Sequence, residues 1–261
     1  MNIKKLSTIF SIFLFFVNLY AENFTKCYNF DCNSINELKV TLQFENISIT
    51  NTKETEIIVE FMADDEALLP EIVQKDSTII VKNAFSNFTN KSSCDVNILV
   101  PEAFTSDSIY LETHYGKITI NNLNAKKLEI IPGSENHYSN IKTDSLVIGD
   151  YDESDVIIDN LNCKMFDIRR TAGNIIISFV KAPDLNSLIR TKNGKITLSI
   201  PEEESFIISA DSFNSKFINK YTGVVKTYIR DGIEYTHNKG GAVISLKTHT
   251  GDITIMARVE R

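Results

Sequence analysis

The stretch Thr-His-Tyr-Gly-Lys-Ile-Thr-Ile at residues 113–120 decides the fold, because its pattern recurs three more times along the chain. The pattern is Thr-x-x-Gly-x-Ile-x-(Ile or Leu). It returns as Thr-Lys-Asn-Gly-Lys-Ile-Thr-Leu at 191–198 and as Thr-His-Thr-Gly-Asp-Ile-Thr-Ile at 248–255. A copy that is one residue shorter in the turn, Thr-Ala-Gly-Asn-Ile-Ile-Ile, occupies 171–177. Each copy joins a turn to an alternating strand, so the repeat predicts a stack of β units.

A longer rhythm underlies these copies between residues 105 and 220. An apolar residue precedes each turn at intervals of 18 to 21 residues: Leu111, Ile130, Ile148, Ile168, Ile189 and Ile208. Two further periods beyond Ile208 lead to Leu246, which precedes the last copy of the phrase. Two-residue alternation accompanies the rhythm, whereas helical periodicity does not. We therefore predict an all-β, single-stranded β-solenoid, in which rungs of about 19 residues bury their Ile and Leu against neighbouring rungs.

The glycine of each phrase marks a turn. A tight corner often needs a positive φ, which glycine adopts without the Cβ clash that other residues suffer. We therefore expect structural turn glycines at Gly116, Gly173, Gly194 and Gly251. We also expect a hairpin at Asp231-Gly232, between strands at 224–230 and 233–235.

Asparagines mark a second set of corners. Asn122, Asn140 and Asn160 each precede a Leu or Ile and recur in step with the rungs. Asparagine tolerates left-handed backbone, and its amide can bond the amide of the next rung. These residues predict a short asparagine ladder, although a chain rich in asparagine could also place one in most turns by chance.

The first 21 residues are predicted to be a signal peptide rather than part of the fold. Lys4 and Lys5 precede an almost uninterrupted apolar run at 6–20, and Ala21 supplies a small residue before the expected cleavage site. A membrane anchor is the alternative, but this run is shorter than the roughly 20 apolar residues that a spanning helix needs. Residues 22–261 contain no linker or low-complexity tract. We expect them to form one domain, without a transmembrane segment, that is exported to the periplasm, the cell surface or the medium.

The charge balance argues against nucleic acid as a partner. The whole chain has a net charge of −7, and loss of the first 21 residues leaves 25 Lys and Arg against 34 Asp and Glu. An acidic chain without basic clusters is poorly suited to phosphate backbones or to anionic membrane surfaces.

Four cysteines, Cys27, Cys32, Cys94 and Cys163, remain in the predicted mature chain. Cys27 and Cys32 are close enough in sequence to form a local disulfide, which an exported compartment permits; free thiols are the equally open alternative. A metal site would need tighter paired spacing and nearby histidine, so no metal is expected there.

These features resemble the bacterial putative-adhesin domain of unknown function, which is related to the head GIN domain. The resemblance rests on the four phrases and on two strand-proline-acid segments, Leu-Val-Pro-Glu at 99–102 and Ser-Ile-Pro-Glu at 199–202. The ending Gly-Asp-Ile-Thr-Ile at 251–255 is also similar to the way those domains finish. The match covers roughly residues 38–259, although the rungs at 128–161 lack the phrase. The resemblance implies an exported, right-handed β-helix-like domain, and it carries no catalytic residues.

The densest acidic cluster lies at Asp150–Asp155, in the segment Gly-Asp-Tyr-Asp-Glu-Ser-Asp. Calcium binding is one interpretation, because calcium takes several carboxylate oxygens, but the glycine expected at the sixth loop position is missing. A solvated turn is the simpler interpretation. The cluster could also supply the paired carboxylates of a polysaccharide-cleaving enzyme, with Arg169 and Arg170 as its only plausible cationic partners. We therefore expect no enzyme, no cofactor and no metal.

Three tyrosines fall near the corners of successive rungs. If Tyr115, Tyr138 and Tyr151 are aligned and exposed, they could form a platform on which sugar rings stack. His114 and His249 share one position in their phrases, and we expect both to be exposed and too far apart to share a metal.

The sequence leaves three classes of function open. The first is an interaction module of the cell envelope, an adhesin that presents outward solenoid corners to a glycan or protein partner. The second is a structural protein that self-associates through the ends of the solenoid. A carbohydrate-active enzyme is the third and weakest.

Overall fold

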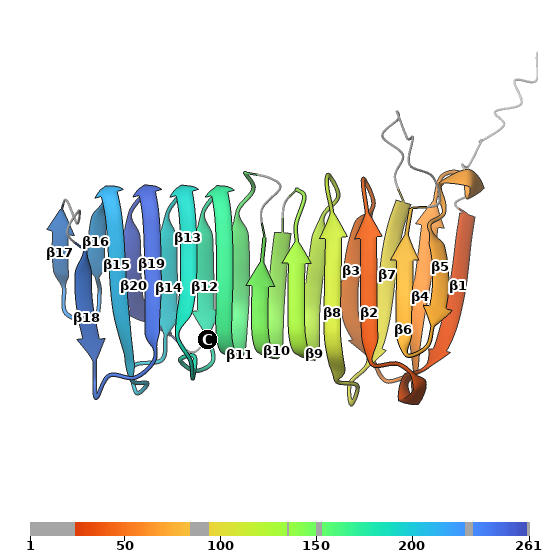
Figure 1. The fold of residues 1–261 in the computed structure, drawn as a ribbon, viewed down its shortest axis with the longest axis horizontal. Coiled ribbons are helices and arrows are strands. Elements are labelled where there is room, and N and C mark those ends of the chain that lie inside the picture. Colours follow the sequence, from red (N-terminus) through yellow and green to blue (C-terminus); the bar gives the residue numbers. More distant parts are fainter. Residues whose placement is uncertain (1–23, 84–93, 135, 150–152, 228–231, 260–261) are drawn as a thin grey trace, which may run out of the picture.

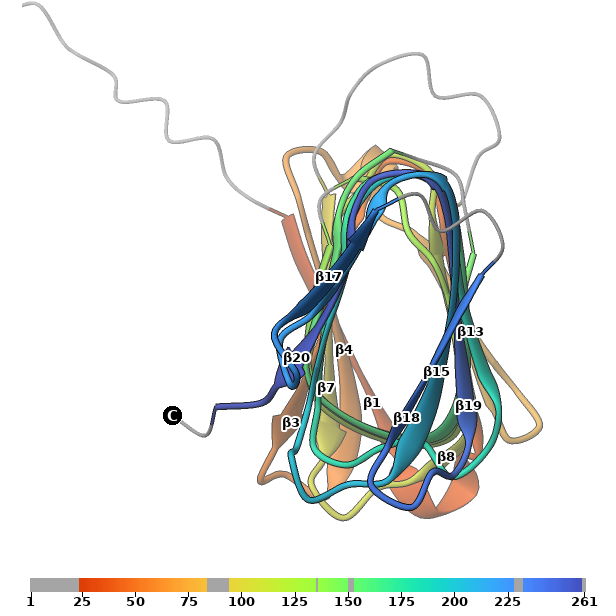
Figure 2. The ribbon, with the colours of Figure 1, turned by 90° about the vertical axis from the view of Figure 1, so that its left-hand side faces the viewer.

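The structure, a computed structural model, describes residues 24–83, 94–134, 136–149, 153–227 and 232–259. The chain forms a flattened stack of strands with two broad faces (Figure 1), and the view along the stack shows the two faces joined at both edges (Figure 2). One face contains β2 (Glu37–Leu42), β5 (Glu71–Lys75), β6 (Thr78–Lys82), β8 (Ser106–Thr113), β13 (Ser187–Asn193), β15 (Phe206–Asn214), β18 (Ile233–His237) and β19 (Val243–Thr250). We call it the β13 face.

The opposite face contains β1 (Phe24–Asp31), β3 (Asn46–Thr52), β4 (Glu56–Ala63), β7 (Cys94–Pro101), β12 (Ile175–Phe179), β14 (Ile196–Ile200), β16 (Lys216–Asn219), β17 (Val224–Thr227) and β20 (Ile253–Ala257). Three long strands bend from this face to the β13 face: β9 (Ile118–Ile131), β10 (Asn136–Ile148) and β11 (Val156–Ala172). Two short 3-10 helices, η1 (Cys32–Ser34) and η2 (Glu66–Leu68), lie in connections. The described chain is therefore all-β in its regular core, as the sequence predicts.

Parallel pairing joins the central rungs in sequence order. Leu111 pairs with Ile130, Ile130 with Ile148, Ile148 with Ile168, and Ile168 with Ile189. Because every step matches one apolar residue to the next, apolar side chains lie above one another between the two faces. One such column contains Ile175, Ile196, Ile253 and Phe217, all of which are buried. Burial of each such side chain contributes about 1.5–3 kcal/mol to folding.

The order of the rungs departs from the sequence near both ends. Ile189 pairs with Leu246 of β19, and β15 lies beyond β19, with Ile208 opposite Ile244. The predicted succession, in which Ile208 follows Ile189, is therefore wrong. At the other end, β2 lies between β6 and β8, and β3 lies between β7 and β9. β2 with β3, and β19 with β20, thus form the second-last parallel rung at their ends of the stack (Figure 1).

Antiparallel strands cover both ends of this parallel stack. β17 pairs with β16 and β18 pairs with β15, whereas β5 pairs with β6 and β4 pairs with β7. Residues 228–231, which include Asp231 of the predicted hairpin, lie outside the described residues. The described strands on either side, β17 and β18, lie on opposite faces and pair with different partners rather than with each other. The described sheet remains open, since β1, β5, β17 and β18 each pair along one side only.

The turn glycines lie along one edge of the stack, which we call the glycine edge. Gly173 and Gly251 have positive φ values of 92° and 123°. Gly116 and Gly194 do not, so the predicted reason for glycine is wrong at these two positions. A Cβ on Gly194 would collide with the carbonyl of Gly173, and a Cβ on Gly251 would collide with the carbonyl of Gly194. The turn at 248–255 therefore nests directly on the turn at 191–198, and that turn nests on the turn at 171–177.

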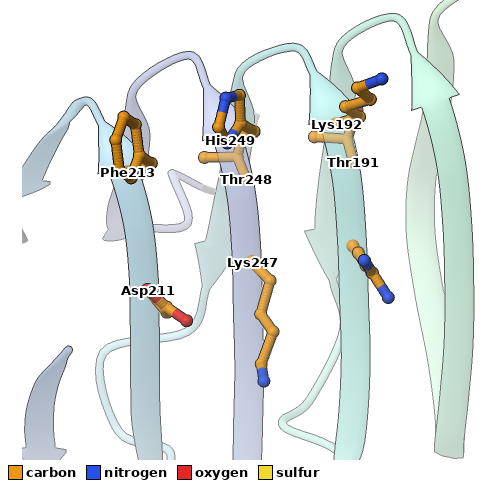
Figure 3. A pocket seen from close by; sticks show the side chains of 8 residues that line it. Thr191, Lys192, Asp211, Phe213, Lys247, Thr248 and His249 are labelled. Atoms are coloured by element: carbon orange, nitrogen blue, oxygen red, sulfur yellow. The ribbon is translucent and has the colours of Figure 1, made fainter. Parts of the chain in front are cut away.

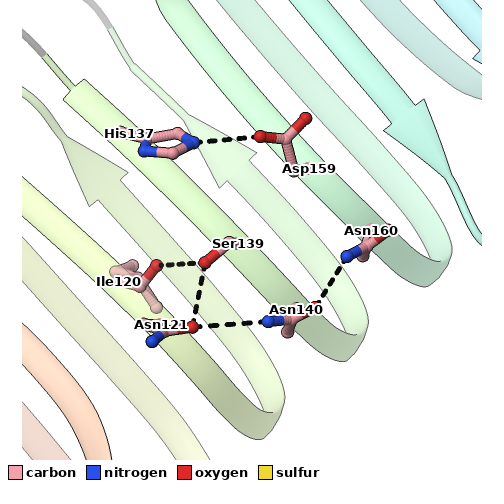
Figure 4. Close-up of polar contacts among 7 residues, drawn as sticks. All are labelled: Ile120, Asn121, His137, Ser139, Asn140, Asp159 and Asn160. Carbon is pink, nitrogen blue, oxygen red and sulfur yellow. Dashed lines mark hydrogen bonds and ion pairs between the residues drawn. The ribbon is translucent and has the colours of Figure 1, made fainter. Parts of the chain in front are cut away.

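The asparagine corners lie along the opposite edge (Figure 4). Asn122, Asn140 and Asn160 have positive φ values of 61°, 53° and 59°. The side-chain nitrogen of Asn160 donates to the side-chain oxygen of Asn140 at 2.7 Å, and Asn140 donates to Asn121 at 3.3 Å. The predicted ladder is confirmed between Asn140 and Asn160, while Asn121 rather than Asn122 continues it.

Candidate ligand-binding surfaces

The predicted tyrosine platform is not formed. Tyr138 is fully buried, because it pairs with Ile120 on one side and Ile158 on the other and so belongs to an inward column. Burial raises the pKa of its hydroxyl well above the usual range. The signal that identifies this orientation is the distance to the corner: Tyr138, Ile120 and Ile158 each stand two residues before the corner asparagine. Tyr151 lies outside the described residues.

Tyr115 does lie at the surface of the glycine edge, with 65% of its area exposed. Its ring stacks on Phe44 with centroids 4.9 Å apart and an angle of 12° between the planes. The backbone nitrogen of Tyr115 donates to the carbonyl of Gln43 at 2.8 Å, which fixes the two turns side by side. The exposed tyrosine therefore has an aromatic partner from a neighbouring turn rather than from another tyrosine.

The acidic cluster is described only in part, since Asp150 and Asp152 lie outside the described residues. The carboxylate of Asp155 accepts hydrogen bonds from the backbone nitrogen of Asn174 at 2.7 Å and from its side-chain nitrogen at 3.1 Å. This carboxylate joins two consecutive turns. Within the part of the chain that the structure describes, no group of three or more His, Cys, Asp or Glu side chains could hold a metal.

The two arginines that could have served an enzyme point in opposite directions. Arg169 is exposed and forms two 2.8 Å hydrogen bonds to the carboxylate of Asp167 on the same strand. Arg170 is only 4% exposed, and its guanidinium donates to the carbonyls of Gly149 and Ser154 beneath the turn. Successive residues of a strand face opposite sides of the sheet, so Arg169 and Arg170 cannot line one substrate groove.

The four cysteines are free thiols in the structure. Cys27 is exposed and Cys32 is half-buried, and no bond joins them. Cys94 and Cys163 are buried among apolar side chains, and this burial raises the pKa of each thiol to about 12. Since the reactive form is the thiolate, the two buried thiols are structural groups.

A basic hollow that the sequence did not reveal lies on the β13 face, over β13, β19 and β15 (Figure 3). It has a volume of about 540 Å³ and is lined by Arg190, Thr191, Lys192, Asp211, Phe213, Lys247, Thr248 and His249. Arg190, Lys247 and Asp211 form one outward row, because Lys247 pairs with Arg190 on one side and with Asp211 on the other. We call these eight residues the basic hollow.

A second outward row of the basic hollow lies two residues nearer the glycine edge. It contains Lys192, His249 and Phe213, whose neighbours Thr191, Thr248 and Ser212 are paired in register. The rings of His249 and Phe213 stack with centroids 5.1 Å apart and an angle of 11° between the planes. Phe213 is 51% exposed. The aromatic pair of His249 and Phe213 therefore lies beside the exposed, positively charged Lys192.

The inward side chains beneath the basic hollow hold its strands in place. Thr191 and Thr248 are almost completely buried. The hydroxyl of Thr248 contacts the carbonyl of Gly194 at 3.1 Å and that of Thr250 at 2.9 Å. The outward rows thus stand on strands whose backbone is fixed from below, which is the arrangement that precise binding surfaces require.

The sequence could not have indicated this site under the expected order of rungs. Residues 190–192 and 247–249 are far apart in the chain, and they meet only because β19 lies between β13 and β15. The phrases gave no signal for this contact, because the phrase at 248–255 shares four of eight residues with the phrase at 191–198 and six of eight with the phrase at 113–120.

The fold is similar to those of solved proteins. The chain matches the crystal structure of a putative adhesin from Bacteroides fragilis with a TM-score of 0.56, at 16% identity, over 90% of this chain and 97% of that one. A putative adhesin from Parabacteroides distasonis matches with a TM-score of 0.46, at 12% identity, over 90% of this chain and 98% of that one. No curated protein matches the sequence.

The described part of the chain contains no helix with the length and hydropathy of a membrane span. The family model described as Toastrack DUF4097 matches residues 36–256, which includes all four copies of the turn phrase and most of the strands. This chain therefore belongs to the Toastrack family, a family of domains of unknown function.

Proposed function

We propose that this protein is an exported, non-enzymatic interaction module of the cell envelope, an adhesin that presents the outward residues of its solenoid to a glycan or protein partner. The observation that carries the proposal is the presence of two aromatic pairs at the glycine edge, the exposed Tyr115 on the half-buried Phe44 and the exposed Phe213 on His249. Exposed aromatic rings are the side chains that most often stack on sugars or anchor protein partners.

The architecture suits this role because it holds outward side chains in a fixed array. Neighbouring strands of a sheet are about 4.8 Å apart, and outward residues of one strand recur about every 7 Å. A ligand with a repeating structure can therefore contact several rungs at once without ordering a loop. Such preorganisation reduces the entropy lost on binding.

Export is part of the same proposal. It rests on the basic and apolar segment at residues 1–21, with 22–261 as a single mature domain, and on the likeness of the fold to a putative adhesin of Bacteroides fragilis. We also expect the right-handed winding that the family resemblance implies. Protease treatment of intact cells tests the location: loss of the protein at the surface supports display, whereas protection until the envelope is opened places it inside.

Self-association through the ends of the stack is the second candidate. Val224 and Val225 of the outer strand β17 are 43% and 56% exposed, and this strand pairs along one side only. Against this candidate, β17 is only four residues long and carries Lys226, and short charged edge strands oppose edge-to-edge pairing. Filaments in electron micrographs of the purified protein would favour assembly over binding.

Glycan-array binding by the purified mature protein tests the proposed function. We expect binding by the wild type and a loss of signal in the Tyr115→Ala, Phe213→Ala double variant. A matched control replaces two other exposed apolar residues, Met165→Ala with Leu185→Ala, away from the glycine edge. Equal loss in both variants would attribute the effect to general surface hydrophobicity. Absence of binding to every glycan and to envelope extracts would reject the proposal.

A further inference from the structure

We propose that the basic hollow binds an acidic sugar, a pyranose that carries a carboxylate, within an acidic polysaccharide. This inference rests on the proposed function and specifies the ligand class. Its first observation is the row of Arg190 and Lys247, which are paired on adjacent strands whose backbones lie about 4.8 Å apart. One carboxylate can therefore contact both cations.

The two cations are available to a ligand. Within the described part of the chain, neither the guanidinium of Arg190 nor the ammonium of Lys247 forms an ion pair, and both side chains are exposed. Lys192, two residues from Arg190 on the same strand, adds a third positive charge to the same side. These like charges repel one another in the free protein, so an anion bound between them relieves this repulsion.

The aromatic pair explains why the ligand is a sugar rather than a simple anion. The row of His249 and Phe213 lies two residues from the row of Lys247 and Asp211, which corresponds to about 7 Å along the strands. One sugar ring covers this distance. Its apolar C–H groups would contact the exposed aromatic pair while its carboxylate lies between Arg190 and Lys247.

Asp211 further restricts the choice of ligand. Its carboxylate lies beside Lys247 in the same outward row and lines the basic hollow. A carboxylate at this place lowers the net positive charge of the basic hollow and accepts hydrogen bonds from hydroxyl groups, which a simple anion lacks. A hydroxyl-rich ligand with a single negative charge per ring satisfies the cations, the aromatic pair and Asp211 together.

Calorimetric titration with three oligosaccharides of equal length tests the inference: an oligogalacturonate, its neutral galactose counterpart and a sulfated galactan. We expect the oligogalacturonate to bind and the neutral counterpart to bind at least about tenfold more weakly, because it lacks the charge-assisted hydrogen bonds. Binding should also weaken as salt concentration increases. Binding of the sulfated galactan in proportion to its charge alone would overturn the sugar-specific site in favour of ion exchange.

Paired variants locate the site. We expect the Arg190→Gln, Lys247→Gln variant to bind the oligogalacturonate at least about tenfold more weakly, since it removes both partners of the carboxylate. The control, Lys195→Gln with Lys216→Gln, makes the same charge change at exposed positions outside the hollow and should remain within about twofold of the wild type. Circular dichroism checks that both variants fold. Equal binding by the wild type and the Arg190, Lys247 variant would overturn the site.

The outcomes for the ligand class and for the proposed function are distinguishable. If the wild type binds neutral glycans or an envelope protein but no acidic sugar, the basic hollow is not an acidic-sugar site and the adhesin proposal stands. If it binds no glycan and no protein, both are rejected.

Discussion

The middle of the stack and its ends are built from the same rung but assembled differently. In the middle, β9, β10 and β11 follow one another in space as they do in the chain. Near the ends, β2 and β19 each lie between strands that are distant from them in sequence. The difference shows that a repeated phrase specifies the shape of a rung but does not specify which rungs are its neighbours. The basic hollow lies near one of these ends, where β13, β19 and β15 are neighbours although they are not consecutive in the chain.

The largest loss of stability is expected from a truncation after residue 242, which removes β19 and β20. In a stack that follows the sequence, this change would remove only a terminal rung. In the observed stack it exposes both the β13–β14 rung and the β15–β16 rung, so we expect loss of the cooperative thermal transition. Circular dichroism melting measures the result.

The matched truncation removes residues 22–31 and with them β1, which pairs only with β4 at the far end of the stack. We expect a lower melting temperature with cooperative unfolding retained. A C-terminal truncation that melts as this one does would show that β19 does not lie inside the stack.

Substitution of one inward residue should cause the next largest loss in the free energy of unfolding. Ile196 is fully buried between Ile175 and Ile253, so Ile196→Lys places a charge in the core and should cost at least about 4 kcal/mol. Lys195→Ala changes the adjacent exposed residue and should alter stability by less than about 0.5 kcal/mol. Chemical denaturation gives both free energies of unfolding, and similar values would contradict the alternation of inward and outward residues.

A smaller effect tests the nesting of the turns. Gly194→Ala places a methyl group against the carbonyl of Gly173, and we expect a loss of about 1–3 kcal/mol because the backbone must shift. Gly116→Ala makes the same change nearer the middle, against the carbonyl of Glu45, and should cost a similar amount. Unfolding by urea measures both variants. A neutral result at Gly194 would contradict the close nesting of the turn at 191–198 on the turn at 171–177.

The smallest expected effect concerns the asparagine ladder of the middle rungs. Asn140→Ala should cost about 1–2 kcal/mol, because alanine is strained at a φ of 53° and the amide contacts are lost. Asn140→Gly keeps the backbone conformation and loses only the amide, so about half of that loss is expected. Equal losses in the two variants would assign the whole effect to the hydrogen bonds.

The candidate sites were predictable to different degrees. The inward or outward direction of a side chain follows from its distance to a corner, so the burial of Tyr138 was implied by its position two residues before Asn140. The exposed Tyr115 was identified from its turn, but its partner Phe44 was not, because the contact joins turns that are far apart in the chain. The basic hollow depends entirely on such contacts.

The sequence by itself determined the rung: the alternating Ile and Leu, the glycine turns, the asparagine corners and the all-β class. These features act within a few residues, through backbone sterics and side-chain alternation. Only the tertiary structure decided the order of the rungs near the ends. That order depends on the packing of turns and columns from distant segments, for which local sequence gives no register. Arg190, Lys247 and the aromatic pair of His249 and Phe213 are neighbours for this reason.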